Sequence, residues 1–419
     1  MVFIFTYGLN DVPRIIFVNR FFSPDHSATS QILSDLAFHL AEVSAGEQTI
    51  HVITSRQTYE QSERLAKEEV LQGVQVHRVG GFNFGRQRLW GRLLDYLSFY
   101  LMAMIQMFKL ARRGDYLISK TDPPLLSIIG LVVSRIRGCR QINWVQDLFP
   151  EVAQALLPNL PWRLLAPPLR GLRNLSLRHA DHNVVIGSRM QERLLAEDVH
   201  PERITVIENW SIAPLQAPPD RMENLYRSRW NLNDTFILGY SGNMGRAHLF
   251  EAMIHAAKAS QEREDIQWIF IGGGPKRAEV ERALAPQRGK NVQFHPYQPR
   301  EKLHHSLSLP DMHLVSLEPE MEGLIFPSKF VGTLQAGRGV LFIGDPDGEM
   351  ARLIREGECG LVFAPDDDAK LLQALFDLAT DPERYQRYGR NALKLGQEHY
   401  SRSRLLNRWQ QLLAPSEHP

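Results

Sequence analysis

Two short stretches of the sequence combine the residue types that bind an anion at the start of a helix. "GYSGNMG" contains Gly242 and Asn243 where a strand pattern ends, and "FPSK" sets Ser328 and Lys329 directly after a proline. The first turn of a helix has free backbone N–H groups and the positive end of the helix dipole, so both stretches predict a phosphate site. Lys329 adds a full positive charge. Its alternative role is that of a solvated helix lysine.

Acidic side chains that could act on a hydroxyl group follow two other strand patterns. Asp147 ends the pattern "QINWVQD", and Glu151 comes one helical turn later. A carboxylate there can orient an acceptor hydroxyl or share its proton, although Asp147 could equally cap a helix. Asp25 and His26 lie in "SPDHSATSQ", directly after the first strand pattern. We expect both at the rim of a binding cleft, with a merely solvated histidine as the alternative.

Strand and helix patterns that alternate along the whole chain must position these residues. Before the proline-rich "SIAPLQAPPD", the apolar runs predict buried strands at "RIIFVNRFF", "TIHVITS", "YLISK" and "HNVVIGS". After it, they predict buried strands at "FILGYSGNMG", "IQWIFIGGGP" and "GVLFIGDPDG". Such alternation predicts an α/β fold with two Rossmann-like, doubly wound domains that face each other across a cleft. We expect a first domain at residues 1–215, a second domain at 216–397, and a C-terminal helix, 398–419, that returns to the first domain.

Composition restricts the possible classes of protein. The chain has 419 residues, of which 43% are hydrophobic and 23% charged, as in ordinary globular proteins. Cys139 and Cys359 are the two cysteines, and their wide separation favours neither a disulfide framework nor a zinc site. The N-terminal sequence lacks the pattern of a signal peptide, so we expect a cytoplasmic protein.

Positive charge and apolar residues are concentrated in one segment. Residues 86–180 contain 14 Lys or Arg and 5 Asp or Glu, a net charge of +9 in a chain whose total is +1. The same segment includes "LLDYLSFYLMAMIQMFKLARR", whose uncharged run is too short for the roughly 20 residues that span a bilayer. It could lie on an anionic membrane surface, or it could be a buried helix of an α/β domain.

Several stretches, in order, resemble one family of enzymes. The chain is similar to the retaining GT-B glycosyltransferases of the family 4 type in four stretches. These are "VIGSRMQERLLAEDVHPERITVIENW", "YSGNMGRAHLFEAMIHAA", "IFIGGGPKRAEVE" and "MEGLIFPSKFVGTLQAGRGVLFIGDPDGEMARLIREGECGLVFAPDD". With "NWVQDLFPE" and "RFFSPDHSATSQ", the chain resembles the bacterial WbuB and WcaI kind, which assemble O-antigen and colanic acid. The resemblance implies that the domain at residues 1–215 binds the acceptor and that the domain at 216–397 binds a nucleotide-sugar donor.

The chain departs from this family at the acidic pair that binds the donor sugar and the ribose. If Glu322 is the first glutamate of the pair, Phe330 stands at the place of the second. If the alignment is instead counted back from Gly337, Leu324 and Gly332 stand at the positions of the two glutamates. Ribose recognition must then come from another residue. We expect Lys329 to compensate, because a cation stabilises the charge that a departing diphosphate develops.

The resemblance also assigns further donor-binding residues. Asn243 and His248 stand where the family has an arginine and a lysine, so we expect Arg246 to act as the substitute cation and His248 to serve packing or the surface. Glu349, in "DPDGE", keeps an acid that lies near the donor in the family. The acidic runs "DPD" and "DDD" are interpreted as surface loops, so no metal site and no cofactor is expected.

Together these observations predict a glycosyltransferase with a lipid-linked, polyprenyl-type saccharide acceptor in surface-polysaccharide biosynthesis. Asp147, Lys329 and Glu322 are the predicted catalytic residues. Peripheral association with the inner face of the cytoplasmic membrane is expected, and binding to nucleic acid is not. Two alternatives stay open. A nucleotide-sugar epimerase shares the two-domain frame, and a non-catalytic binding partner could have kept the fold after losing the glutamate pair.

Overall fold

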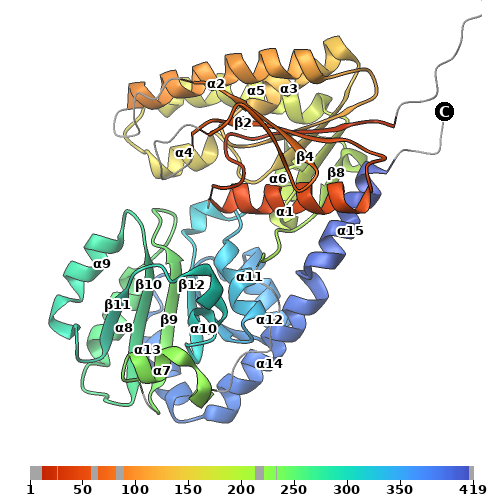
Figure 1. Ribbon diagram of the computed structural model, residues 1–419. Coiled ribbons are helices and arrows are strands. Elements are labelled where there is room, and N and C mark those ends of the chain that lie inside the picture. The colour runs from red at the N-terminus through yellow and green to blue at the C-terminus, as the bar shows by residue number, and fades with distance from the viewer. Residues whose placement is uncertain are drawn as a thin grey trace, which may run out of the picture.

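The computed structural model describes residues 12–25, 27–57, 65–81, 89–212, 221–232 and 234–414, and it consists of two α/β domains joined along one side (Figure 1). Each domain has its own sheet with helices on both faces, which confirms the predicted fold class. The predicted boundary at residues 215 and 216 lies outside the described residues. None of the described helices is both long and apolar enough to cross a membrane.

The first domain contains eight strands and six α-helices among the described residues. In chain order these are β1 (Ile15–Val18), α1 (Ala28–Val43), β2 (Ile50–Ser55), β3 (Glu68–Leu71), β4 (Val74–Val79), α2 (Leu89–Leu110), β5 (Tyr116–Lys120), α3 (Leu126–Arg137), β6 (Arg140–Val145), α4 (Glu151–Leu156), α5 (Trp162–His179), β7 (His182–Val185), α6 (Ser188–Ala196) and β8 (Ile204–Val206). The strand order is β3-β4-β2-β1-β5-β6-β7-β8.

The second domain contains six strands, and the last helices of the chain follow it. Its elements are α7 (Leu225–Arg229), β9 (Phe236–Asn243), α8 (Glu251–Ala259), β10 (Ile266–Gly273), α9 (Arg277–Ala283), β11 (Val292–His295), α10 (Leu303–Leu307), β12 (Met312–Ser316), α11 (Ser328–Gln335), β13 (Gly339–Ile343), α12 (Glu349–Glu356), β14 (Gly360–Phe363), α13 (Asp368–Ala379), α14 (Pro382–His399) and α15 (Arg402–Leu413). The strand order is β11-β10-β9-β12-β13-β14.

Strand order reverses once in each sheet, between β1 and β5 in the first and between β9 and β12 in the second. In doubly wound sheets a crevice opens outside the carboxyl ends of the strands at this point, and ligands bind there. Strands β1, β2, β5, β12 and β13 are buried along their whole length, as continuous apolar runs predict. Helices α1 and α15 pack against one face of the first sheet, and α2 and α3 pack against the other.

The structure contains one short strand that was not predicted from the sequence. Strand β3 pairs with β4 in the only antiparallel pair among the described strands, and its side chains are partly exposed. Gln72 and Gly73 join the two strands with φ values of +46° and +81°. A two-residue turn of this kind matches the twist of a hairpin. The run "EEVL" is too short and too polar to stand out as a buried strand.

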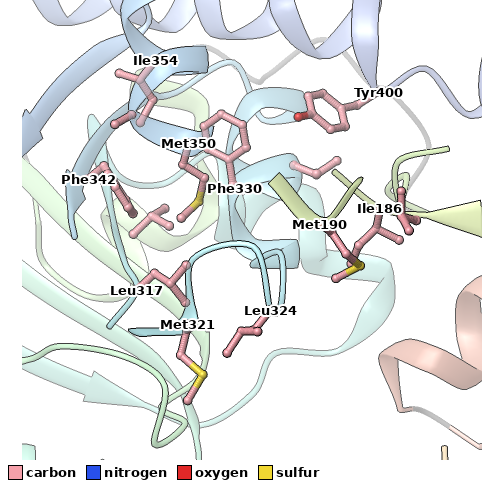
Figure 2. Packing of buried hydrophobic residues seen from close by; sticks show 14 of the residues in the cluster. Ile186, Met190, Leu317, Met321, Leu324, Phe330, Phe342, Met350, Ile354 and Tyr400 are labelled. Carbon is pink, nitrogen blue, oxygen red and sulfur yellow. The ribbon is translucent and has the colours of Figure 1, made fainter. Parts of the chain in front are cut away.

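One of the hydrophobic clusters contains residues of both domains. Ile186 and Met190 of the first domain pack in the same cluster as Leu324 and Phe330 of the second (Figure 2). The main chain adds a direct link, since the Leu148 N–H donates to the Leu324 carbonyl at 3.0 Å. Tyr400, just before α15, packs in the same cluster, and from there α15 crosses back to the first domain (Figure 1). Its apolar side chains are buried there against the first sheet.

Candidate functional site

The carboxyl end of β9 meets the amino end of α11, which brings together the two stretches predicted to bind an anion. Lys329, the second residue of α11, places its Nζ 2.9 Å from Nε2 of His248 and 5.1 Å from the centre of the Tyr240 ring. Its Cε packs against Gly242, where an added Cβ would lie 3.1 Å away. Gly242 also has a φ of +121°, so both space and backbone conformation require glycine here.

His248 lies beneath this lysine, between the loop after β9 and the end of β12. Its Nδ1 is 2.6 Å from the carbonyl oxygen of Ser316, the last residue of β12. A carbonyl can only accept, so Nδ1 carries the proton and Nε2 presents its lone pair to Lys329. Burial and the neighbouring Lys329 charge lower the pKa of His248 to about 3. The ring is therefore neutral at physiological pH. The expectation of a packing role was incomplete, because the ring also contacts the lysine.

Burial lowers the pKa of Lys329 to about 7, and no carboxylate acts to raise it. A second lysine nearby is in a different situation. Lys276 donates from Nζ to the His248 carbonyl at 2.7 Å, and its Nζ lies 3.5 Å from Glu318. Lys276 is thus balanced by an acid, whereas the positive charge of Lys329 is not. A partly buried cation with no counter-ion among the described residues, at the strand-order reversal, is an electrostatic site for an anion.

The other donor-side predictions lie around this point with less defined contacts. Ser328 and Asn243 are exposed. Asn243 packs against the glycine loop after β10, because a Cβ on Gly274 would lie 2.3 Å from its Oδ1. Arg246 is exposed, and within the described part of the chain its side chain makes no hydrogen bond or ion pair. The expected substitute cation is therefore near the site but not fixed in it.

Glu322 makes hydrogen bonds to the start of α12 and to a side chain of α6. Its Oε1 accepts from the Glu349 N–H at 2.8 Å, and its carbonyl accepts from Nε of Arg193 at 2.9 Å. The first of these bonds caps the start of α12. Burial raises the pKa of Glu322 above its usual value. In this structure the carboxylate is used at the start of α12, and the catalytic role of Glu322 stays a prediction.

Glu349 has a similar structural role between the domains. Its Oε1 accepts from the N–H and the Oγ of Ser188 at 2.7 and 2.9 Å, and its Oε2 accepts from the Arg189 N–H at 3.2 Å. These groups open α6 in the first domain, so Glu349 caps a helix of the opposite domain. We call this contact the interdomain cap. The predicted donor contact of Glu349 finds no support here, because both oxygens are engaged and the side chain is buried.

The acceptor-side prediction centres on Asp147, two residues beyond β6. Burial raises the pKa of this carboxyl group to about 6, while a hydrogen bond from Thr121 opposes the shift. Its Oδ1 is buried, with no hydrogen-bond partner among the described residues. The carboxylate lines a cavity of about 30 Å³ with Thr121, Asn143 and Arg173. The alternative as a helix cap does not apply, since α4 begins after Pro150 without a side-chain cap.

A lysine that the sequence reading overlooked lies beside Asp147. Lys120 is the last residue of β5, where the strand order reverses, and it is 1% exposed. Its Nζ lies 3.9 Å from the centre of the Trp144 ring and donates to the Thr29 carbonyl at 3.0 Å. Burial lowers the pKa of Lys120 to about 7, against the attraction of Asp122 and Asp147. No local signal marks a lysine at the end of a buried strand as buried.

The remaining acceptor-side predictions have structural partners or lie outside the description. Glu151 pairs with Nε of Arg170 at 2.9 Å and with Nη1 of Arg173 at 2.6 Å, which fastens α4 to α5. Acceptor binding by Glu151 stays a prediction. Asp25 is buried, and its Oδ1 accepts from the Ser27 N–H at 2.8 Å. His26 lies outside the described residues.

Comparisons with known proteins agree with this geometry. Residues 33–210 match a glycosyl transferase 4-like domain, and residues 223–395 match glycosyl transferases group 1. A probable glycosyltransferase WbjE of Pseudomonas aeruginosa is 26% identical over 70% of the chain and 73% of its own length. A putative colanic acid biosynthesis glycosyl transferase, WcaI of Escherichia coli, is 27% identical over 62% of the chain and 65% of its own length.

Solved structures share the fold at lower identity. Sucrose-phosphate synthase from Thermosynechococcus elongatus superposes with a TM-score of 0.72 at 16% identity, over 96% of this chain and 98% of its own. Anabaena HepE in complex with UDP-glucose gives a TM-score of 0.69 at 15% identity, over 96% of this chain and 99% of its own. At this level of identity the likeness establishes the two-domain fold.

Proposed function

The chain belongs to the glycosyltransferases that combine a glycosyl transferase 4-like domain with a group 1 domain, and from that premise we propose its reaction. It transfers a sugar from a nucleotide-sugar donor to a lipid-linked saccharide during surface-polysaccharide assembly. The transfer proceeds with retention at the sugar and without a metal. The relatives with polysaccharide names support the pathway class, and the Lys329 site supports the chemistry.

The observation that carries this proposal is the unbalanced cation at the junction of β9 and α11. In the reaction the bond between the sugar carbon and the diphosphate oxygen breaks, and the leaving group gains negative charge. Lys329 stabilises that charge more in the transition state than in the ground state. The acceptor hydroxyl forms the new bond from the same face. Its proton passes to the departing phosphate, and Asp147 orients the hydroxyl.

Exposed apolar side chains on three adjacent helices support a lipid-linked acceptor. Helices α2, α3 and α5 carry eleven of the seventeen exposed large hydrophobic residues of the described chain: Leu94, Leu97, Leu101, Met102, Ile105, Val132, Ile136, Leu164, Leu165, Leu172 and Leu175. The three helices lie together on the outer side of the first domain (Figure 1). Arg113, Arg137 and Arg163 are exposed in the same segment. An apolar surface with cations fits an anionic bilayer.

Vesicle binding tests the membrane part of the proposal. We expect cosedimentation with vesicles that contain anionic lipid and release at high salt, because screening removes the attraction of the headgroups. Leu97→Glu with Leu101→Glu should abolish binding. The matched control is Leu195→Glu, an exposed leucine on α6 outside the three helices. Equal binding to neutral and anionic vesicles would contradict an electrostatic membrane surface.

A nucleotide panel tests the transferase part. UDP-, GDP- and dTDP-sugars are compared for the rise that each gives in the unfolding midpoint, because a ligand of the folded state stabilises it. The stabilising donor is then incubated with the protein and lipid-linked saccharide, and the products are separated. Transfer to the lipid supports the proposal. Conversion of the donor sugar to its epimer without transfer would support the epimerase alternative instead.

A further inference from the structure

Contacts to both the backbone and the ring of His248 fix the orientation of its side chain. Its backbone N–H donates to the Gly245 carbonyl at 3.3 Å, and its own carbonyl accepts from Lys276. The ring stands edge-on to Tyr240, with 6.3 Å between the ring centres. Ser316 accepts from Nδ1, which fixes both the tautomer and the rotation of the ring. A ring so constrained can offer its Nε2 lone pair in one direction only, and Lys329 lies in that direction.

We propose that His248 is a positioning residue that fixes the Lys329 ammonium over the glycine turn at the end of β9, ready for the diphosphate of the donor. The inference rests on the proposed function and goes beyond it, because it assigns a role to a residue that does not itself need to touch the donor. The basis is the bonded series Ser316–His248–Lys329, which links the end of β12 to the start of α11.

A neutral histidine suits this position better than an acid would. An ammonium has three N–H donors, so Lys329 can keep one bond to His248 and turn the others toward phosphate oxygens. An aspartate or glutamate in place of His248 would hold the lysine equally well but would neutralise its charge and repel the diphosphate. A neutral acceptor orients the cation and leaves its charge for the ligand. Nearby Lys276, in contrast, is paired with Glu318.

The constraint also reduces the entropy that the lysine loses on binding. A free lysine side chain loses rotamer entropy when it is immobilised. Lys329 has already lost much of this freedom through its contacts with Gly242, Tyr240 and His248. Preorganised charges of this kind are the ones that stabilise a developing charge most effectively.

Calorimetric binding of nucleoside diphosphates tests the inference. UDP, GDP and dTDP are titrated into the wild-type protein, and the tightest of the three serves as the probe. We expect His248→Ala to weaken its binding about tenfold, which corresponds to the loss of one hydrogen bond to a charged group. His248→Gln should recover most of the affinity, because the amide oxygen can accept from Lys329. The control is His313→Gln, which removes another buried histidine bonded to a carbonyl, that of Leu307.

A double-mutant cycle separates positioning from general destabilisation. In a Lys329→Met background, His248→Ala should change the affinity by less than about twofold, because the group that it positions is gone. An equal tenfold loss in both backgrounds, or an unchanged affinity in the single variant, would overturn the inference. Failure of the wild-type protein to bind any of the three nucleoside diphosphates would instead overturn the proposed function.

Discussion

A buried lysine and a partly buried one occupy corresponding places in the two domains, and they differ in their acidic neighbours. Lys120 ends β5 and Lys329 faces the end of β9, so each lies where the strand order of its sheet reverses. Burial lowers the pKa of each to about 7. The charge of Lys120 is attracted by Asp122 and Asp147, whereas no carboxylate acts on Lys329.

The difference indicates which of the two sites needs an anionic ligand. A buried charge costs free energy unless a partner compensates it. Lys120 has its compensation within the protein, so its role is to hold Asp147 and the strand ends in place. Lys329 lacks it, so the protein keeps an unfavourable charge that only a bound anion can balance. Stability given up at one residue in this way is typical of a functional position.

Loss of the Lys329 charge should have the largest effect on the reaction. We expect Lys329→Ala to lower the turnover of the saturating donor roughly a hundredfold to a thousandfold, since a lost electrostatic donor costs about 2.7–4 kcal/mol. Lys329→Arg should recover only part of the activity, because a planar guanidinium reaches phosphate differently. Steady-state product formation measures both. Wild-type turnover in Lys329→Ala would make this lysine a structural residue like Lys120.

Removal of each charge should change stability in opposite directions. Lys120→Met leaves Asp122 and Asp147 without their cation and should lower the free energy of unfolding by about 3 kcal/mol. Lys329→Met removes an uncompensated charge, so the variant should be as stable as the wild type or more stable by about 1 kcal/mol. Urea unfolding monitored by circular dichroism compares the two. Equal destabilisation by both substitutions would refute the distinction between them.

Much of the fold, and one part of the site, could be predicted from local sequence. Apolar runs that alternate with helix patterns predicted both sheets, because burial on both faces leaves a direct trace in residue type. Lys329 could be found because a proline and a serine mark the helix start beside it. The hairpin strand β3 was not predicted, because "EEVL" is short and partly exposed.

Residues whose roles depend on distant partners could not be predicted in the same way. His248 meets Lys329 across 81 positions of sequence, and Glu349 meets Ser188 across 161. A carboxylate that caps a helix and one that binds a ligand look alike in sequence, because their difference lies in which N–H groups face them. The structural contacts of Glu322 and Glu151 could not be predicted for this reason.

Donor binding should draw a proton to Lys329 but not to Lys120. At pH 8 the free Lys329 is mostly neutral, since its pKa is about 7. A bound diphosphate favours the charged form and raises that pKa, so binding at pH 8 should take up close to one proton. Calorimetry in buffers of different ionisation enthalpy measures the uptake. It should vanish in Lys329→Met and persist in Lys120→Met. Unchanged uptake in Lys329→Met would place the titrating group elsewhere.

The interdomain cap extends the comparison from the two lysines to the carboxylate of Glu349. Substitution of Glu349 should have the smallest effect of those predicted here. Glu349 is compensated by backbone N–H groups of Ser188 and Arg189, as Lys120 is compensated by acids. Glu349→Gln keeps the shape but presents an amide N–H₂ to one of these donors, so it should cost about 1 kcal/mol of stability. The affinity for the tightest nucleoside diphosphate should stay within about twofold, because compensated charges hold the fold and do not recognise the ligand. A tenfold loss of affinity at unchanged stability would mean that Glu349 contacts the donor after all, and that compensation in the free protein does not distinguish structural charges from functional ones.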